Sequence, residues 1–103
     1  MSKKKRNREQ ILASVLGSAI SGATKTRIMY ASFLSFRQLE KYLSYMLETR
    51  LVELDSRTGK YLTTSRGLEF LKHFEELQRI ENNFIEKRML LSEFLEVKSQ
   101  RPL

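Results

Sequence analysis

The chain of 103 residues contains no cysteine and a single histidine, His73. Without cysteine it has no disulfide framework and no thiolate metal site, an absence that suits a reducing cytoplasmic interior. One histidine cannot form a multi-histidine metal site, and as a catalytic base it lacks a nucleophile and an orienting partner. We therefore expect neither a metal centre nor histidine-based catalysis.

Other signatures are missing as well. No apolar run approaches the roughly 18 to 20 residues that span a bilayer, and the basic N-terminus does not lead into a signal peptide. The chain shows no glycine-rich phosphate loop, nucleophile elbow or paired acids. A chain this small spends most of its structure on a core, with little left to shape a pocket. We expect a cytoplasmic protein that is not an enzyme and that uses no cofactor, small-molecule substrate or membrane.

Positive charge is concentrated in the first two thirds of the chain. Residues 1–67 carry 13 Lys or Arg against 5 Asp or Glu, a net charge of +8. Residues 68–103 carry 6 against 7, a net charge of −1. The first part is therefore expected to meet a polyanion, and the second part to have another role.

Residues 1–8 contain five cations and no acid. Mutual repulsion and the lack of apolar side chains predict a flexible basic arm. Lys4 and Lys5 are candidates for phosphate contacts, because counterion release lets such a run bind DNA. The alternative is a tail that only improves solubility.

Three helices are predicted over residues 9–48. Asn7 with Gln10 and Ser35 with Gln38 are capping-box pairs, and Thr24 is a third N-cap. Apolar residues at helical spacing predict the buried face of each helix. The side chains assigned to packing, the aromatic ones included, are Ile11, Leu12, Val15, Leu16, Ala19, Ile20, Ile28, Met29, Tyr30, Ala31, Phe33, Phe36, Leu39, Leu43, Met46 and Leu47.

After Thr49 the pattern changes to that of a β-hairpin. Residues 51–54 and 61–63 predict two antiparallel strands around a turn at residues 55–60. Three helices followed by a hairpin with a basic tip is the element order of a winged helix-turn-helix, whose third helix enters the major groove. We expect a mainly α fold with a small β-hairpin, in which residues 9–67 form a winged-helix domain.

A last helix is predicted from Ser65 to about Val97, because this stretch has no proline and Thr64 provides an N-cap. At 1.5 Å per residue it would be about 50 Å long, well beyond the diameter of the domain. Large apolar side chains repeat every seven residues along this helix. A second row lies three residues after the first, and in it His73 and Lys87 replace apolar residues. The first row contains Phe70, Leu77, Phe84 and Leu91, and the apolar members of the second row are Ile80 and Phe94.

Residues 68–103 are therefore predicted to be a coiled-coil dimerisation helix and tail, because monomers avoid a row of exposed apolar side chains. Leu68, Leu71 and Phe74 are expected to complete the core of the winged-helix domain instead. In a parallel pair His73 and Lys87 would each face a like group, which favours an antiparallel pair. The predicted homodimer interface contains Leu77, Ile80, Phe84, Leu91 and Phe94.

The segment from Thr24 to Leu71 resembles the small dimeric winged-helix DNA-binding proteins of archaeal chromatin, known from Sulfolobus as the ten-kilodalton class. The resemblance is most specific at KTRIMY, residues 25–30. The pattern Y-x-x-T-x-R-G at residues 61–67 is similar to the entry of that family into its final helix, although Thr63 stands where the family usually has leucine. The resemblance implies a non-enzymatic homodimer in which an antiparallel coiled coil carries two heads that act on duplex DNA.

Three surfaces are candidates for DNA contact. On the third helix, Arg and Gln can read base edges, while Lys and Tyr can hold phosphates. Lys25 and Arg27 begin the second helix, where backbone amides favour a phosphate. Arg57 and Lys60 flank the wing turn and could reach the backbone or the minor groove. The residues expected on the third-helix face are Arg37, Gln38, Lys41 and Tyr45.

Each of these surfaces has a simpler interpretation, namely a solvated helix face or a basic hairpin tip that keeps a sheet edge soluble. The leading hypothesis is a nucleoid-associated DNA-binding homodimer that organises chromatin or regulates transcription. An alternative is a protein-interaction adaptor, with the winged helix as scaffold and the coiled coil as partner-binding element. Structured RNA is a third possibility, less suited because an A-form major groove does not admit a helix well.

Overall fold

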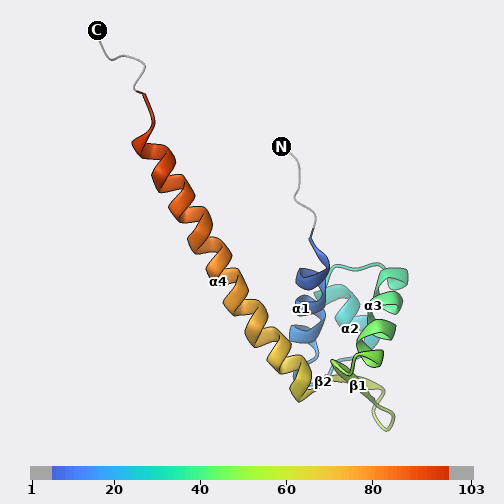
Figure 1. The fold of residues 1–103 in the computed structure, drawn as a ribbon. Helices are drawn as coiled ribbons and strands as arrows, with labels where there is room; N and C mark the ends of the chain where they lie inside the picture. The colour runs from blue at the N-terminus through green and yellow to red at the C-terminus, as the bar shows by residue number, and fades with distance from the viewer. Residues whose placement is uncertain (1–5, 98–103) are drawn as a thin grey trace.

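The computed structural model describes residues 6–97 (Figure 1). It confirms the predicted order of three helices, a hairpin and a long final helix. The elements are α1 (Arg8–Ser18), α2 (Lys25–Ala31), α3 (Phe36–Glu48), β1 (Val52–Asp55), β2 (Lys60–Thr63) and α4 (Ser65–Phe94).

Both predicted capping boxes are present. The Asn7 side chain accepts a hydrogen bond from the Gln10 backbone N at 2.8 Å, and Gln10 Oε1 accepts one from the Asn7 backbone N at 2.8 Å. Ser35 and Gln38 make the same pair of bonds at the start of α3. One boundary differs from the prediction: Arg8, expected in the flexible arm, is the first residue of α1, because the cap at Asn7 starts the helix there.

Two helices end in turns that the sequence did not indicate. After α2, Phe33 has φ of 55° and its N–H donates to Tyr30 O at 3.3 Å, while the Leu34 N–H donates to Met29 O at 3.1 Å. Arg50 has φ of 63° in the same position after α3. These are Schellman turns, and their left-handed residue is usually glycine. The missing glycine is the reason that they could not be predicted.

The hairpin pairs β1 with β2 antiparallel, from Val52 opposite Thr63 to Asp55 opposite Lys60. A third segment joins it at Ala23, whose N–H donates to Tyr61 O at 3.0 Å and whose carbonyl accepts from Tyr61 N at 2.8 Å. A single bridging residue has no alternating pattern, so this pairing was not predicted. It ties the start of α2 to the wing.

The core lies between the three short helices and the base of the hairpin. Eight of the sixteen predicted packing positions are buried, and Ile11 and Met29 are partly buried. The other six are exposed, so their assignment to the core was wrong: Ile20, Tyr30, Ala31, Phe33, Phe36 and Leu47. These side chains lie at the edges of α2 and α3, in the α2–α3 turn or, for Ile20, just after the end of α1. The buried apolar residues are Leu12, Val15, Leu16, Ala19, Ala23, Ile28, Leu34, Leu39, Leu43, Met46, Leu51 and Val52.

The first two turns of α4 complete this core. Phe70 and Leu71 pack against it, whereas Leu68, expected there, is exposed. Thr63, at the position where the family usually has leucine, donates its hydroxyl to Leu16 O at 2.6 Å. The Leu16 carbonyl, near the end of α1, also accepts from the Ala19 N–H at 3.2 Å, so the Thr63 hydroxyl is its second donor and ties β2 to α1.

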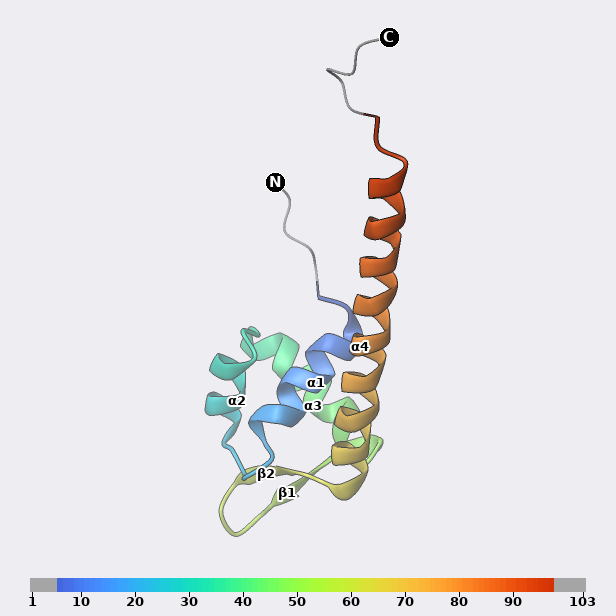
Figure 2. The ribbon, with the colours of Figure 1, turned by 90° about the vertical axis from the view of Figure 1, so that its left-hand side faces the viewer.

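Beyond its base, α4 leaves the domain (Figures 1 and 2). Its 30 residues reach about 45 Å at 1.5 Å per residue. The radius of gyration of the Cα atoms is 19.7 Å, compared with about 13 Å for a compact domain of this length. Every side chain from Glu75 to Val97 is exposed in the single chain, including the whole predicted dimer interface.

Candidate nucleic-acid interface

The candidate groove-facing residues share the exposed side of α3. Leu39, Leu43 and Met46 hold the opposite side of the helix in the core. With about 100° of rotation per residue, this packing turns the predicted face towards solvent. The exposed residues are Arg37, Gln38, Lys41 and Tyr45.

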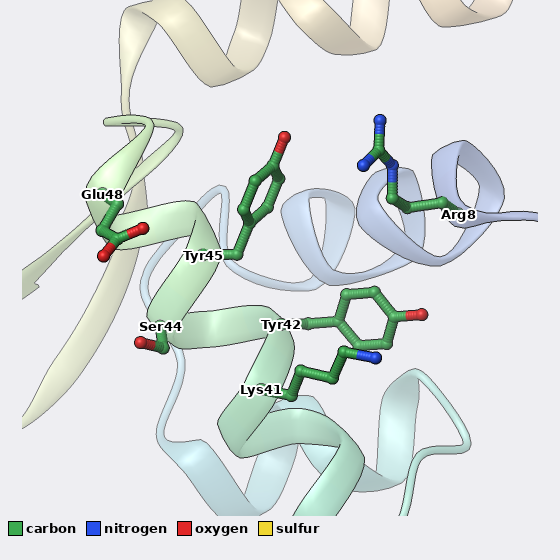
Figure 3. A pocket seen from close by; sticks show the side chains of 6 residues that line it. All are labelled: Arg8, Lys41, Tyr42, Ser44, Tyr45 and Glu48. Carbon is green, nitrogen blue, oxygen red and sulfur yellow. The ribbon is translucent and has the colours of Figure 1, made fainter.

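A shallow hollow of about 460 Å³ lies along this side of α3 (Figure 3). The Arg8 guanidinium reaches in from α1 and lies 5.6 Å from the centre of the Tyr45 ring. Lys41 Nζ lies 5.8 Å from the centre of the Tyr42 ring. Two cations from two helices are thus held beside aromatic rings on one surface. The hollow is lined by Arg8, Lys41, Tyr42, Ser44, Tyr45 and Glu48.

Arg8 belongs to this surface but was not among the predicted site residues. It was counted with the basic arm, although the capping box at Asn7 already indicated that the helix includes it. Arg6 is also part of the folded domain, since its Nη2 donates to Phe33 O at 3.3 Å. The start of α1 therefore adds basic side chains beside α3 and beside the α2–α3 turn.

The side-chain oxygen of Gln38 is used in the N-terminal cap of α3. Its Oε1 accepts a hydrogen bond from the Ser35 backbone N at 2.9 Å. Bidentate reading of adenine requires both the oxygen and the nitrogen of the amide. In this arrangement only the amide NH₂ is free to donate to a base or a phosphate.

Lys25, at the start of α2, forms an ion pair with Glu40 of α3. The hydrogen bond to Glu40 raises the pKa of Lys25 above its usual value, so this side chain stays charged. Its Nζ also lies 5.5 Å from the centre of the Phe36 ring. The partner carboxylate neutralises much of the charge that Lys25 would offer to a phosphate. Arg27 is exposed and forms no ion pair with another residue of the range 6–97.

The wing turn exposes both of its predicted basic residues, Arg57 and Lys60. Asp55 organises the turn: its Oδ1 accepts from Arg57 N at 3.0 Å and its carbonyl accepts from Gly59 N at 2.8 Å. Gly59, with φ of 71°, provides the left-handed residue that the turn requires. Lys4 and Lys5, the candidates in the arm, lie outside the described residues.

Residues 6–97 contain no group of three or more His, Cys, Asp or Glu that could hold a metal ion. His73 is exposed on α4, with Nδ1 3.3 Å from Glu76 Oε1. Over the same residues, no helix has the length and apolar character needed to cross a membrane.

Two of three comparisons with known proteins found matches, and both agree with this architecture. A comparison with curated proteins found no match. Among solved structures, Sso10a-2, a DNA-binding protein from Sulfolobus solfataricus, has the same fold with a TM-score of 0.81 and 21% sequence identity, over 90% of this chain and 100% of that one. A family model described as winged helix-turn-helix matches residues 5–82, well over half of the chain. The chain therefore belongs to the winged helix-turn-helix family.

Proposed function

We propose that the protein is a homodimer that binds duplex DNA by placing α3 in the major groove. The observation that carries this proposal is the single exposed surface on which Arg37, Lys41, Tyr45 and Arg8 lie together, opposite the core. A major groove about 12 Å wide admits one α-helix. Sso10a-2, which shares the fold, is described as a DNA-binding protein.

The contacts divide into two kinds. Arg37, near the start of α3, has the fork of donors that reads guanine, and Tyr45, Lys41 and Arg8 hold phosphates at the groove edges. The wing residues Arg57 and Lys60, together with Arg27 and the arm residues Lys4 and Lys5, add backbone or minor-groove contacts. Lys25 is held by Glu40 and adds a phosphate contact only when that ion pair opens.

The second half of the proposal is dimerisation through α4. An exposed row of large apolar side chains on a projecting helix is costly in water, and a second copy of the same row covers it. Leu77, Phe84 and Leu91 occupy heptad position a of this seam, and Ile80, Lys87 and Phe94 occupy position d.

The spacing of these residues favours antiparallel helices. If the two-fold axis passes between Ile85 and Glu86, Leu77 lies opposite Phe94 and Ile80 lies opposite Leu91. Phe84 then lies opposite Lys87, whose aliphatic stem can cover the ring. A parallel pair would instead place two Lys87 ammonium groups side by side.

The heads would then lie at the two ends of the coiled coil, suited to bridging or clamping DNA in the nucleoid. Chromatin organisation and transcriptional regulation use this same mechanism. The first predicts mostly phosphate contacts with steep salt dependence, and the second an operator preferred by roughly 10³-fold or more over other sequences.

The test is a titration of the protein against several unrelated duplexes at two salt concentrations, with the Arg37→Ala/Lys41→Ala variant alongside. We expect the variant to bind each duplex at least about ten-fold more weakly, with a salt slope reduced by about one unit for each lost phosphate contact. Both side chains are exposed, so the variant should fold normally. Fluorescence anisotropy of labelled duplexes measures both quantities.

A matched control is Lys72→Ala/Arg79→Ala, which removes the same charge from exposed positions on α4. It should bind nearly as the parent does. If the α3 variant binds like the parent or like this control, groove docking by α3 is wrong and the adaptor hypothesis gains support. Similar affinity for all duplexes would favour the chromatin role, and binding to one sequence the regulatory role.

Glu40→Gln is expected to strengthen duplex binding about three- to ten-fold at low salt, because it removes a carboxylate beside α3 and frees Lys25. The salt slope should become steeper by about one unit as Lys25 takes up a phosphate contact. The variant Glu40→Gln/Lys25→Ala should lose this gain. Unchanged affinity and slope in Glu40→Gln would show that Lys25 does not face the DNA.

A further inference from the structure

Three large aromatic side chains surround the α2–α3 turn, and no other part of residues 6–97 covers them. Tyr30, Phe33 and Phe36 are 71%, 84% and 59% exposed. We call these three residues the turn patch. They lie outside the α4 seam, since α1 lies between α2 and α4 (Figure 2). Neither core packing nor the proposed dimer accounts for them.

Phe33 is unfavourable for folding in two respects. Its φ of 55° is a left-handed conformation that bulky side chains rarely adopt, at a helix end where glycine or asparagine is usual. Its ring gains little from packing, because most of it faces solvent. Glycine at this position would remove both costs. A strained residue with an exposed ring points to a role outside the stability of the fold.

The surroundings of the turn patch are cationic. Residues 10–39 contain no Asp or Glu. Arg6 donates to the carbonyl of Phe33 itself. Lys25 Nζ lies 5.5 Å from the centre of the Phe36 ring, and the Glu40 carboxylate pairs with it. Arg27 and Arg37 are exposed on the two helices that the turn connects. A ligand that fits such a surface has flat apolar faces and negative charges spaced regularly along its length.

We propose that the turn patch binds unpaired nucleobases of single-stranded DNA. The rings of Phe33 and its two neighbours stack on bases, and the surrounding cations hold the phosphates. In a duplex the base faces are stacked inside and unavailable, so this site takes free strands, gaps or melted regions. It borders the groove-facing side of α3 and shares Arg37 with it, but base stacking on the aromatic rings does not require groove docking.

The test uses the Phe33→Gly variant of the full chain and a fluorescein-labelled oligothymidylate of about 15 nucleotides, near the upper limit of common single-strand site sizes. An abasic strand of the same length is the second probe, because it keeps the phosphates and lacks the bases. We expect the parent to bind oligothymidylate more tightly than the abasic strand. Phe33→Gly should weaken oligothymidylate binding about ten-fold and leave binding of the abasic strand unchanged.

Thermal unfolding distinguishes this role from a structural one. Phe33→Gly should unfold at the same temperature as the parent or a few degrees higher, because glycine relieves the left-handed strain. A lower unfolding temperature, an unchanged affinity for oligothymidylate, or equal affinity of the parent for both strands would each overturn the proposal. A stabilised variant with unchanged single-strand binding would instead assign the turn patch to a protein partner.

The two proposals can fail separately. Arg37→Ala/Lys41→Ala should lose duplex affinity and still prefer oligothymidylate to the abasic strand, whereas Phe33→Gly should keep its duplex affinity. If Arg37→Ala/Lys41→Ala also loses that preference, stacking at the turn patch is not an independent activity and the proposal is wrong.

Discussion

Replacing Phe84 by aspartate is expected to leave a folded monomer that binds duplex DNA roughly 100-fold or more weakly, because two linked heads bind more tightly than one. In the proposed dimer each Phe84 ring is buried in the seam, at about 1.5 to 3 kcal/mol per side chain. The substitution removes both rings. Each new carboxylate would face Lys87 of the other copy, but such an ion pair contributes only about 0 to 1 kcal/mol and does not replace the buried ring. Phe84 lies far along α4, so the winged-helix domain should keep its structure.

Met89→Asp is the matched control. Met89 and Phe84 are both 61% exposed in the single chain. Met89 lies well over 90° from the seam around the helix at about 100° per residue, so its substitution should leave the dimer intact. Sedimentation equilibrium gives the oligomeric state and anisotropy the DNA affinity. A dimeric Phe84→Asp variant, or a monomeric parent, would show that α4 does not pair through this seam.

The same dimer permits a test of helix orientation. The chain has no native cysteine, so Ser92→Cys provides a unique site for a spin label. With the axis between residues 85 and 86, the two Ser92 backbones are about 20 Å apart along an antiparallel coiled coil. In a parallel coiled coil they are about 10 Å apart. Pulsed electron resonance detects the longer separation, whereas the shorter one broadens the continuous-wave spectrum. Broadening of that kind would refute the antiparallel arrangement.

Gly67→Ala is expected to destabilise the winged-helix domain by about 2 to 3 kcal/mol, a large share of the stability of a small domain. A Cβ at this position would overlap the carbonyl oxygen of Leu51 and lie 2.7 Å from Thr63 Cγ2. The Leu51 carbonyl is held by hydrogen bonds from Thr64, so it cannot move away freely. The midpoint of thermal unfolding should fall by roughly 10 to 20 °C.

Gly17→Ala makes the same chemical change in another helix and is the control. A Cβ at Gly17 meets no atom within 4 Å. Alanine is the better helix former there, so the variant should be more stable by about 0.5 kcal/mol. Circular dichroism during thermal unfolding compares the two variants. Equal effects would mean that helix propensity, and not the close approach of α4 to Leu51, controls stability at Gly67.

Local signals explain why much of the fold could be predicted. The caps at Asn7, Thr24, Ser35 and Thr64 act within three residues, so the four helix starts follow from short stretches of sequence. The wing turn likewise depends on neighbouring residues. The spacing of apolar residues along α4 also predicts a seam for a second helix, and this pairing stays a prediction.

The candidate site was predicted less completely. Periodicity placed Arg37, Lys41 and Tyr45 on the exposed face of α3, but it could not show that Arg8 of α1 lies against Tyr45. It also could not show that Glu40 pairs with Lys25. Both contacts join side chains that are at least 15 residues apart in the chain.

The sequence by itself thus determined where the helices begin, the order of the elements and the presence of a long final helix after the basic part of the chain, because these depend on near neighbours and on composition. Only the tertiary structure decided which edges of the apolar stripes are covered. It left Phe33 and Phe36 in solvent and brought Thr63 and Gly67 against α1 and Leu51. The reason is that burial depends on the elements that pack nearby, and these come from distant parts of the chain.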